Sequence, residues 1–140
     1  GYTAEEVQQG IGYMLQVKPA QFLADVGAAV NAVRGSGRVG IVGYCWGGTV
    51  AWLAACELPV AAAASDYGGG IVKPLAQAPA EGLHIPLADA EKIRAAHPAG
   101  VFHIYPADHG FNCTERAAYD APSAALAFER TLAFFAGHVG

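Results

Sequence analysis

The sequence is poor in charged residues and has no cluster of basic ones. Eight lysines and arginines stand against twelve aspartates and glutamates, which gives a net charge of −4 over 140 residues. Because nucleic-acid binding depends on clustered positive charge, no nucleic-acid partner is expected. No apolar run approaches the roughly 20 residues that a membrane-spanning helix needs, so no membrane partner is expected either. The polar start, residues 1–6, does not resemble a signal peptide.

Cysteine and histidine are also sparse, and neither forms a metal-binding pattern. The three cysteines, Cys45, Cys56 and Cys113, are an odd number without C-x-x-C spacing. This argues against a disulfide framework or a zinc site and favours a reducing, cytoplasmic setting. The five histidines form no H-x-x-x-H or H-E-x-x-H pair, so we expect no metal and no cofactor.

What the sequence does have is apolar residues, 54% of the total, in alternating strand and helix patterns. These predict one domain over residues 1–140 with an α/β fold, a mostly parallel sheet flanked by helices. Strands are expected at Val39–Tyr44, Pro59–Tyr67 and Val101–Tyr105. Helices are expected at 3–16, 19–34, 47–56, 89–96 and 123–135, the first with a capping box of Thr3 and Glu6. Residues 70–86 show no clear period and are expected to form a loop.

Periodicity and residue type also predict which side chains are buried. The strand 39–44 is apolar at nearly every position, as expected for a parallel strand buried on both faces. Cys56 is interpreted as a packing residue, His103 as lying at the edge of the core and His97 as a surface residue. The closing helix is expected to pack through Leu126, Phe128, Leu132 and Phe135.

A glycine-rich turn around Cys45 is the centre of the sequence. A strand, then Gly-Tyr-Cys-Trp-Gly-Gly at 43–48, then a helix of small residues is the nucleophile-elbow pattern of α/β-hydrolases, with sulfur in place of oxygen. Glycines at 43, 47 and 48 leave room for close packing around a strained central residue. The first N–H groups of the helix, that of Trp46 foremost, can stabilise an oxyanion. A buried structural cysteine or a phosphate-binding turn would show the same local pattern.

His109 is the candidate base. It follows the predicted strand 101–105 and is flanked by Gly110. Sites in open α/β sheets form at the carboxyl ends of strands, so we expect His109 and Cys45 to meet there. Their chain order, nucleophile before base, is the one that α/β-hydrolases use.

Three motifs together resemble the dienelactone hydrolase (carboxymethylenebutenolidase) family: residues 43–48, 65–69 and 105–112. The segment 129–135 is similar to the last helix of that family. The resemblance implies an α/β-hydrolase fold and a Cys–Asp–His triad that hydrolyses a lactone or related ester, with Cys45 as nucleophile and His109 as base. Tyr67 and Phe111, inside these motifs, are expected to bind substrate.

The sequence departs from the family pattern in two places. Family members are longer, and their leading strands would precede Gly1, so the domain is expected to be incomplete. The triad aspartate would stand where Gly82 is, and its supporting strand is expected to be missing. Three acidic residues are candidates to replace it: Glu81, Asp66 and Asp108. Arg116 is a candidate to hold a substrate carboxylate.

Two functions remain open from the sequence. The first is a hydrolase of small carboxylic esters or lactones, working through an acyl-enzyme on Cys45. The second is a catalytically inert hydrolase-like domain that binds a partner or self-associates through exposed sheet edges. A glutamine-amidotransferase-like domain requires a glutamate two residues after its histidine, and residue 111 is a phenylalanine.

Overall fold

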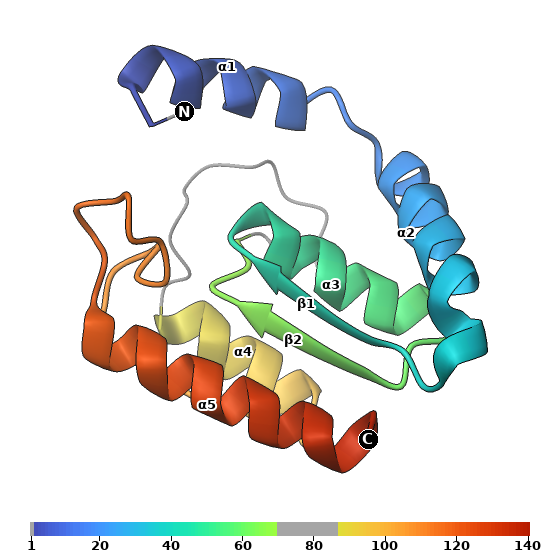
Figure 1. The fold of residues 1–140 in the computed structure, drawn as a ribbon. Coiled ribbons are helices and arrows are strands. Elements are labelled where there is room, and N and C mark those ends of the chain that lie inside the picture. The colour runs from blue at the N-terminus through green and yellow to red at the C-terminus, as the bar shows by residue number, and fades with distance from the viewer. Residues whose placement is uncertain (1, 70–86) are drawn as a thin grey trace.

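The computed structural model describes residues 2–69 and 87–140 (Figure 1). Its elements are α1 (Ala4–Met14), α2 (Pro19–Val33), a 3-10 turn (Arg34–Ser36), β1 (Gly40–Tyr44), α3 (Trp46–Glu57), β2 (Ala62–Asp66), α4 (Leu87–Ala96) and α5 (Ala121–His138). The predicted loop at 70–86, with Glu81 and Gly82, lies outside the described residues.

The two strands form a parallel sheet joined by α3. Gly40 pairs with Ala62, and the register runs to Tyr44 opposite Asp66. Side chains alternate between the two faces of a strand, so Gly40 and Gly43 face opposite ways. A Cβ at Gly43 would overlap the first turn of α3, whereas one at Gly40 would meet Phe135 of α5 at 2.8 Å. Therefore α3 covers one face of the sheet and the end of α5 covers the other, which confirms the predicted α/β class (Figure 1).

Local sequence signals set the helix starts, as predicted for α1 and α2, whereas α5 begins at Ala121 and not at the predicted Ser123. Thr3 caps α1, and the backbone N–H of Thr3 donates to the Glu6 carboxylate at 3.1 Å in the predicted capping box. Pro19 occupies the first turn of α2. Asp120 caps α5 by accepting a hydrogen bond from the Ser123 N–H at 2.8 Å.

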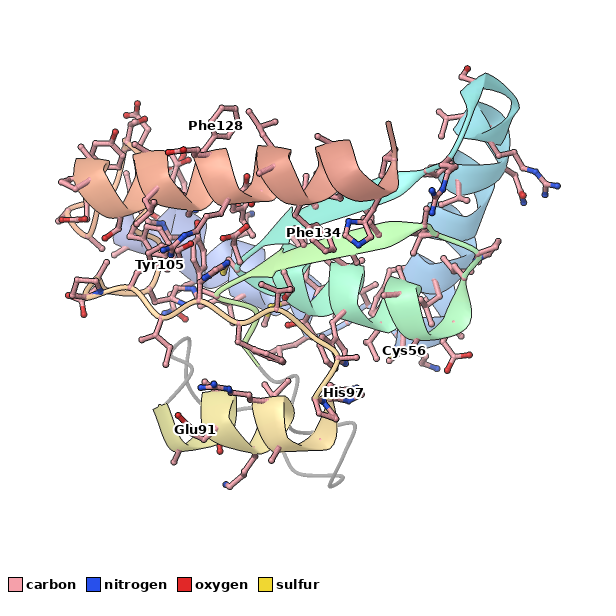
Figure 2. All side chains as sticks on the ribbon, turned by 90° about the horizontal axis from the view of Figure 1, so that it is seen from below. Cys56, Glu91, His97, Tyr105, Phe128 and Phe134 are labelled. Atoms are coloured by element: carbon pink, nitrogen blue, oxygen red, sulfur yellow. The ribbon has the colours of Figure 1, made fainter. Side chains whose placement is uncertain are left out.

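The prediction of a third strand at Val101–Tyr105 is wrong. These residues are irregular, and none of them joins the backbone ladder of the described chain. A strand exists only where a neighbour completes its hydrogen bonds, and an apolar sequence alone does not supply one. Val101 and Ile104 are exposed, while Phe102 and Tyr105 are half-buried, and Tyr105 lies beneath α5 (Figure 2).

Burial also differs from the predictions for β1 and α3. On the face of β1 opposite α3, Gly40 is met by Phe135 of α5, but Val42 and Tyr44 are 43% and 42% exposed. The strand is therefore not buried on both faces. Cys56 is exposed on the outer side of α3 and is not a packing residue (Figure 2).

The predicted core face of α5 is right only at Phe135, which is half-buried and packs against Gly40 of β1. Leu126, Phe128 and Leu132 are exposed, whereas Ser123 and Ala127 are buried. Figure 2 shows Phe134 pointing toward the sheet and Phe128 pointing away from it. Ser123 and Ala127 are small and one helical turn apart, so the first half of α5 approaches closely and leaves Leu126 and Phe128 outside.

The predicted burial of His97 and His103 is wrong, and the two are the reverse of what was expected. His97 is half-buried, with its ring edge-on to Trp52 at a centroid distance of 4.7 Å. His103 is exposed, because the segment that carries it is not part of the sheet.

Candidate active site

Cys45 stands between the end of β1 and the start of α3 in strained backbone geometry. Its φ of 56° and ψ of −127° lie outside the regions that residues with a side chain favour. Its N–H donates to the carbonyl oxygen of Asp66 at 3.0 Å, and its own carbonyl accepts from the Gly48 N–H at 2.9 Å. The ends of both strands therefore hold the turn that presents the half-buried thiol.

Two of the three elbow glycines are required by close contacts. A Cβ at Gly43 would overlap the carbonyl of Gly47, and one at Gly48 would lie 2.8 Å from the Asp66 carbonyl oxygen. A Cβ at Gly47 would meet nothing within 4 Å, so the packing reason expected for this glycine does not hold. The first turn of α3 rests directly on β1 and on the chain after β2 because glycine stands at 43 and 48.

The structure brings His109 to Cys45. The imidazole Nε2 lies 3.1 Å from the Cys45 Sγ, and the pair is partly buried. Gly110, at φ 92°, bends the loop just after the histidine, and the Phe111 N–H donates to the Asp108 carbonyl at 3.1 Å. The carbonyl of Phe111 accepts from the Asp120 N–H at 3.1 Å, which joins the loop to the start of α5.

Aromatic rings pack around the imidazole. The ring of Tyr67 meets His109 edge-on, with a centroid distance of 5.1 Å and an interplanar angle of 66°. Phe111 meets the Tyr67 ring at 5.2 Å and is only 5% exposed, so it lies behind Tyr67. Trp46 carries the first N–H of α3, and its ring packs edge-on against Phe22 of α2 at 5.8 Å.

Burial shapes the acid–base behaviour at the end of β2. It raises the pKa of Asp66 to about 6. It also raises the pKa of Tyr67 to about 12, and the charge of Asp66 adds to that rise. The pKa of Tyr44 is raised by burial and by Asp66. Both tyrosines are protonated at neutral pH, as tyrosines with the ordinary pKa of 10 also are, and can donate hydrogen bonds.

The three candidate acids are placed differently. Asp66 ends β2 beside Tyr67, and Asp108 is exposed. Neither carboxylate forms a hydrogen bond with His109 in the part of the chain that the structure describes. Glu81 lies outside that part.

Two contacts near the His109 loop were not expected from the sequence. The Cys113 thiol donates to the Tyr2 hydroxyl at 3.4 Å and so joins the loop to the start of the chain. The side chain of Arg116 packs against Gly110, where a Cβ would lie 3.0 Å from the arginine Cδ. Arg116 therefore packs against the residue that follows the base, His109. No sequence pattern links positions as distant as Tyr2 and Cys113.

Metal-binding clusters and membrane spans are both absent from residues 2–69 and 87–140. No group of three or more His, Cys, Asp or Glu side chains in these two ranges could hold a metal ion. None of the helices described there has both the length and the apolar character to cross a membrane.

Known proteins that are similar to this chain in sequence and in structure are longer than it is. A family model described as the dienelactone hydrolase family matches residues 3–139. Carboxymethylenebutenolidase from Pseudomonas putida is 34% identical over 133 residues, which cover 81% of this chain and 56% of the relative. A proposed carboxymethylenebutenolidase from Synechocystis sp. is 31% identical over 164 residues, covering 96% and 67%. The solved structure of a proposed dienelactone hydrolase from Klebsiella pneumoniae superposes with a TM-score of 0.72 at 28% identity, covering 88% of this chain and 63% of that one. The chain thus spans 56 to 67% of the length of these relatives.

Proposed function

The chain belongs to the dienelactone hydrolase family, and from this premise we propose that it hydrolyses small carboxylic esters or lactones through a covalent intermediate on Cys45. The observation that carries the proposal is the 3.1 Å separation between His109 Nε2 and Cys45 Sγ. This is the distance at which an imidazole can take a proton from a nucleophile.

The reaction begins when His109 accepts the thiol proton and the sulfur attacks the carbonyl carbon of the substrate. The tetrahedral intermediate collapses to a thioester as the alcohol leaves with the proton from the imidazolium. His109 then takes a proton from water, whose oxygen attacks the thioester. The acid is released, and the proton returns to the sulfur.

The first turn of α3 supplies the oxyanion site. The N–H groups that open a helix have no partner within it, and Cys45 stands immediately before the first of them. We assign the Trp46 N–H to the substrate oxyanion, since it follows the nucleophile directly. Such a donor typically contributes about 10²- to 10³-fold to the rate.

Substrate recognition is assigned to the residues around the base. Tyr67 presents its ring beside His109, with the buried Phe111 supporting it from behind. Arg116 lies beside Gly110 and carries the charge that a substrate carboxylate needs. The three cysteines are free thiols, which fits a cytoplasmic location for this activity.

One observation favours a second function, that of an inert hydrolase-like domain that self-associates. Val42 and Tyr44 leave an apolar area on the open face of a two-stranded sheet. Exposed sheet surfaces of this kind promote association between chains.

The decisive experiment follows product release and covalent labelling with an activated aryl ester and an enol lactone. We expect a burst of product and a mass increase on the Cys45 peptide. Both should be lost in Cys45→Ala, and the rate should fall about 10²-fold or more in His109→Ala. The exposed Cys56 provides a matched control, because Cys56→Ala should keep the burst. Turnover that survives in Cys45→Ala would refute the mechanism, and no turnover in any variant would favour the inert domain.

A further inference from the structure

The backbone of the His109 loop is not joined to the strands that carry Cys45. Residues 101–105 do not pair with β2 in the described chain, so the segment that precedes the His109 loop is not a strand of the sheet. Within the described residues its backbone hydrogen bonds run inside the loop, as from the Cys113 N–H to the Gly110 carbonyl at 2.9 Å, or to Asp120. Among the described residues, side-chain contacts therefore connect the imidazole to the elements that carry the thiol.

A row of rings reaches from α5 to the imidazole. The guanidinium carbon of Arg130 lies 5.4 Å from the Tyr105 ring centroid, and Tyr105 meets Phe111 at 5.3 Å. Phe111 meets Tyr67 at 5.2 Å, and Tyr67 meets His109 at 5.1 Å. Tyr105 lies beneath α5 in Figure 2, so the row connects the outer helix to the site.

Tyr67 is the member of this row whose neighbours in the chain contact the turn and helix that carry Cys45. It follows Asp66, whose carbonyl accepts the Cys45 N–H at 3.0 Å. It precedes Gly68, which is buried against the start of α3, where a Cβ would lie 2.8 Å from the backbone of Gly48. Its φ of 39° is unusual for a residue with a side chain, and it turns the chain sharply after β2. The backbone on both sides thus fixes the position from which the Tyr67 side chain leaves the chain, and the rings of Tyr44 and Phe111 pack against its ring.

We propose that Tyr67 is a positioning residue, whose ring edge holds the His109 imidazole so that Nε2 faces the Cys45 sulfur. This inference rests on the proposed function and adds to it a role for Tyr67 other than substrate contact. Aromatic edge contacts have directional preferences, so the ring restricts both the tilt and the distance of the imidazole. From the strength of such contacts we expect an effect of about 3- to 10-fold on the reactivity of Cys45.

The test is the rate at which iodoacetamide alkylates Cys45 at neutral pH, read peptide by peptide by mass spectrometry. Cys56 reports in the same sample as an exposed internal reference. Tyr67→Asn removes the ring but keeps a residue that tolerates positive φ, and it should slow the alkylation of Cys45 about 3- to 10-fold. Tyr67→Phe keeps the ring and should restore the rate. Tyr67→Asn should have no further effect in His109→Ala, because the ring acts through the imidazole.

Trp52→Leu is the matched control, because it removes an edge-on contact between an aromatic ring and a histidine, His97, at a centroid distance of 4.7 Å. It should leave the alkylation of Cys45 unchanged. If Tyr67→Asn does not fold, Phe111→Leu weakens the same row and should give a smaller loss that depends on His109.

Each outcome separates this inference from the proposed function. Equal rates in the parent and in His109→Ala would overturn the pair of Cys45 and His109 itself. A loss in His109→Ala without a loss in Tyr67→Asn would overturn only the positioning role. The positioning role is likewise overturned if Tyr67→Phe is as slow as Tyr67→Asn, or if Tyr67→Asn slows alkylation equally without His109.

Discussion

Replacing Asp66 with asparagine is expected to stabilise the protein near neutral pH and to have little effect in acid. Burial raises the pKa of this carboxyl from 3.8 to about 6 in the folded state. A carboxyl whose pKa is raised on folding favours the folded state fully below its unfolded pKa. That contribution is lost as the pH rises through the folded value. Above about pH 6 the folded protein therefore holds a partly buried carboxylate, which asparagine replaces with a neutral group of the same shape.

The size of the effect follows from the shift. About two pKa units correspond to roughly 3 kcal/mol in the free energy of unfolding. Asp66 is only partly buried, and solvent screening reduces this to about 1–2 kcal/mol. For a domain of this length, that is a rise of about 3–7 °C in Tm.

Thermal unfolding of Asp66→Asn at about pH 7.5 and about pH 4 measures this directly. Asp108→Asn is the matched control, because Asp108 is exposed and its substitution should change the free energy of unfolding by less than about 0.5 kcal/mol. A lower Tm at pH 7.5, or the same change at both pH values, would refute the reasoning. The esterase activity of the same variant tests Asp66 as the acid of the triad, since loss of that acid costs roughly 10⁴-fold.

Three further substitutions test the site from other directions. Gly43→Ala should cost more than about 4 kcal/mol in urea denaturation, because its Cβ would overlap the Gly47 carbonyl. Gly47→Ala should stay within about 1 kcal/mol of the parent, since its Cβ meets nothing within 4 Å, and equal effects would contradict this packing account. Arg116→Gln should raise KM about tenfold for an ester that carries a carboxylate and leave KM for a neutral ester unchanged. A parallel rise for both esters would exclude a carboxylate-binding role.

The features that the sequence predicted correctly are those that neighbouring residues determine. The capping box of Thr3 and Glu6 and the strand–turn–helix order around Cys45 depend on contacts within a few positions. His109 does approach Cys45 at 3.1 Å, as expected, but the reason given for it was wrong, because no sheet strand precedes His109 in the described chain. The fold class follows from the same alternation of strands and helices.

The predictions that failed depend on partners distant in the chain. Residues 101–105 have the composition of a strand but lack a neighbour to pair with in the described chain. The closing helix has apolar residues on more than one side, and only the approach of α5 to the sheet decides that Ala127 is buried and Phe128 exposed. The row of rings through Tyr67 combines residues from several segments, and no periodicity in the sequence reveals it.

The unusual backbone at Cys45 and Tyr67 has a consequence for selection. These are the two residues other than glycine with positive φ in the described chain, and both lie at the reactive thiol. Each such conformation costs about 1–3 kcal/mol, which a glycine or asparagine would partly recover. A library of variants screened for thermal stability alone would therefore accumulate substitutions at positions 45 and 67 first. These would replace the nucleophile and the ring beside its base. Retention of cysteine and tyrosine at these positions over many generations would record selection for chemistry that opposes selection for stability.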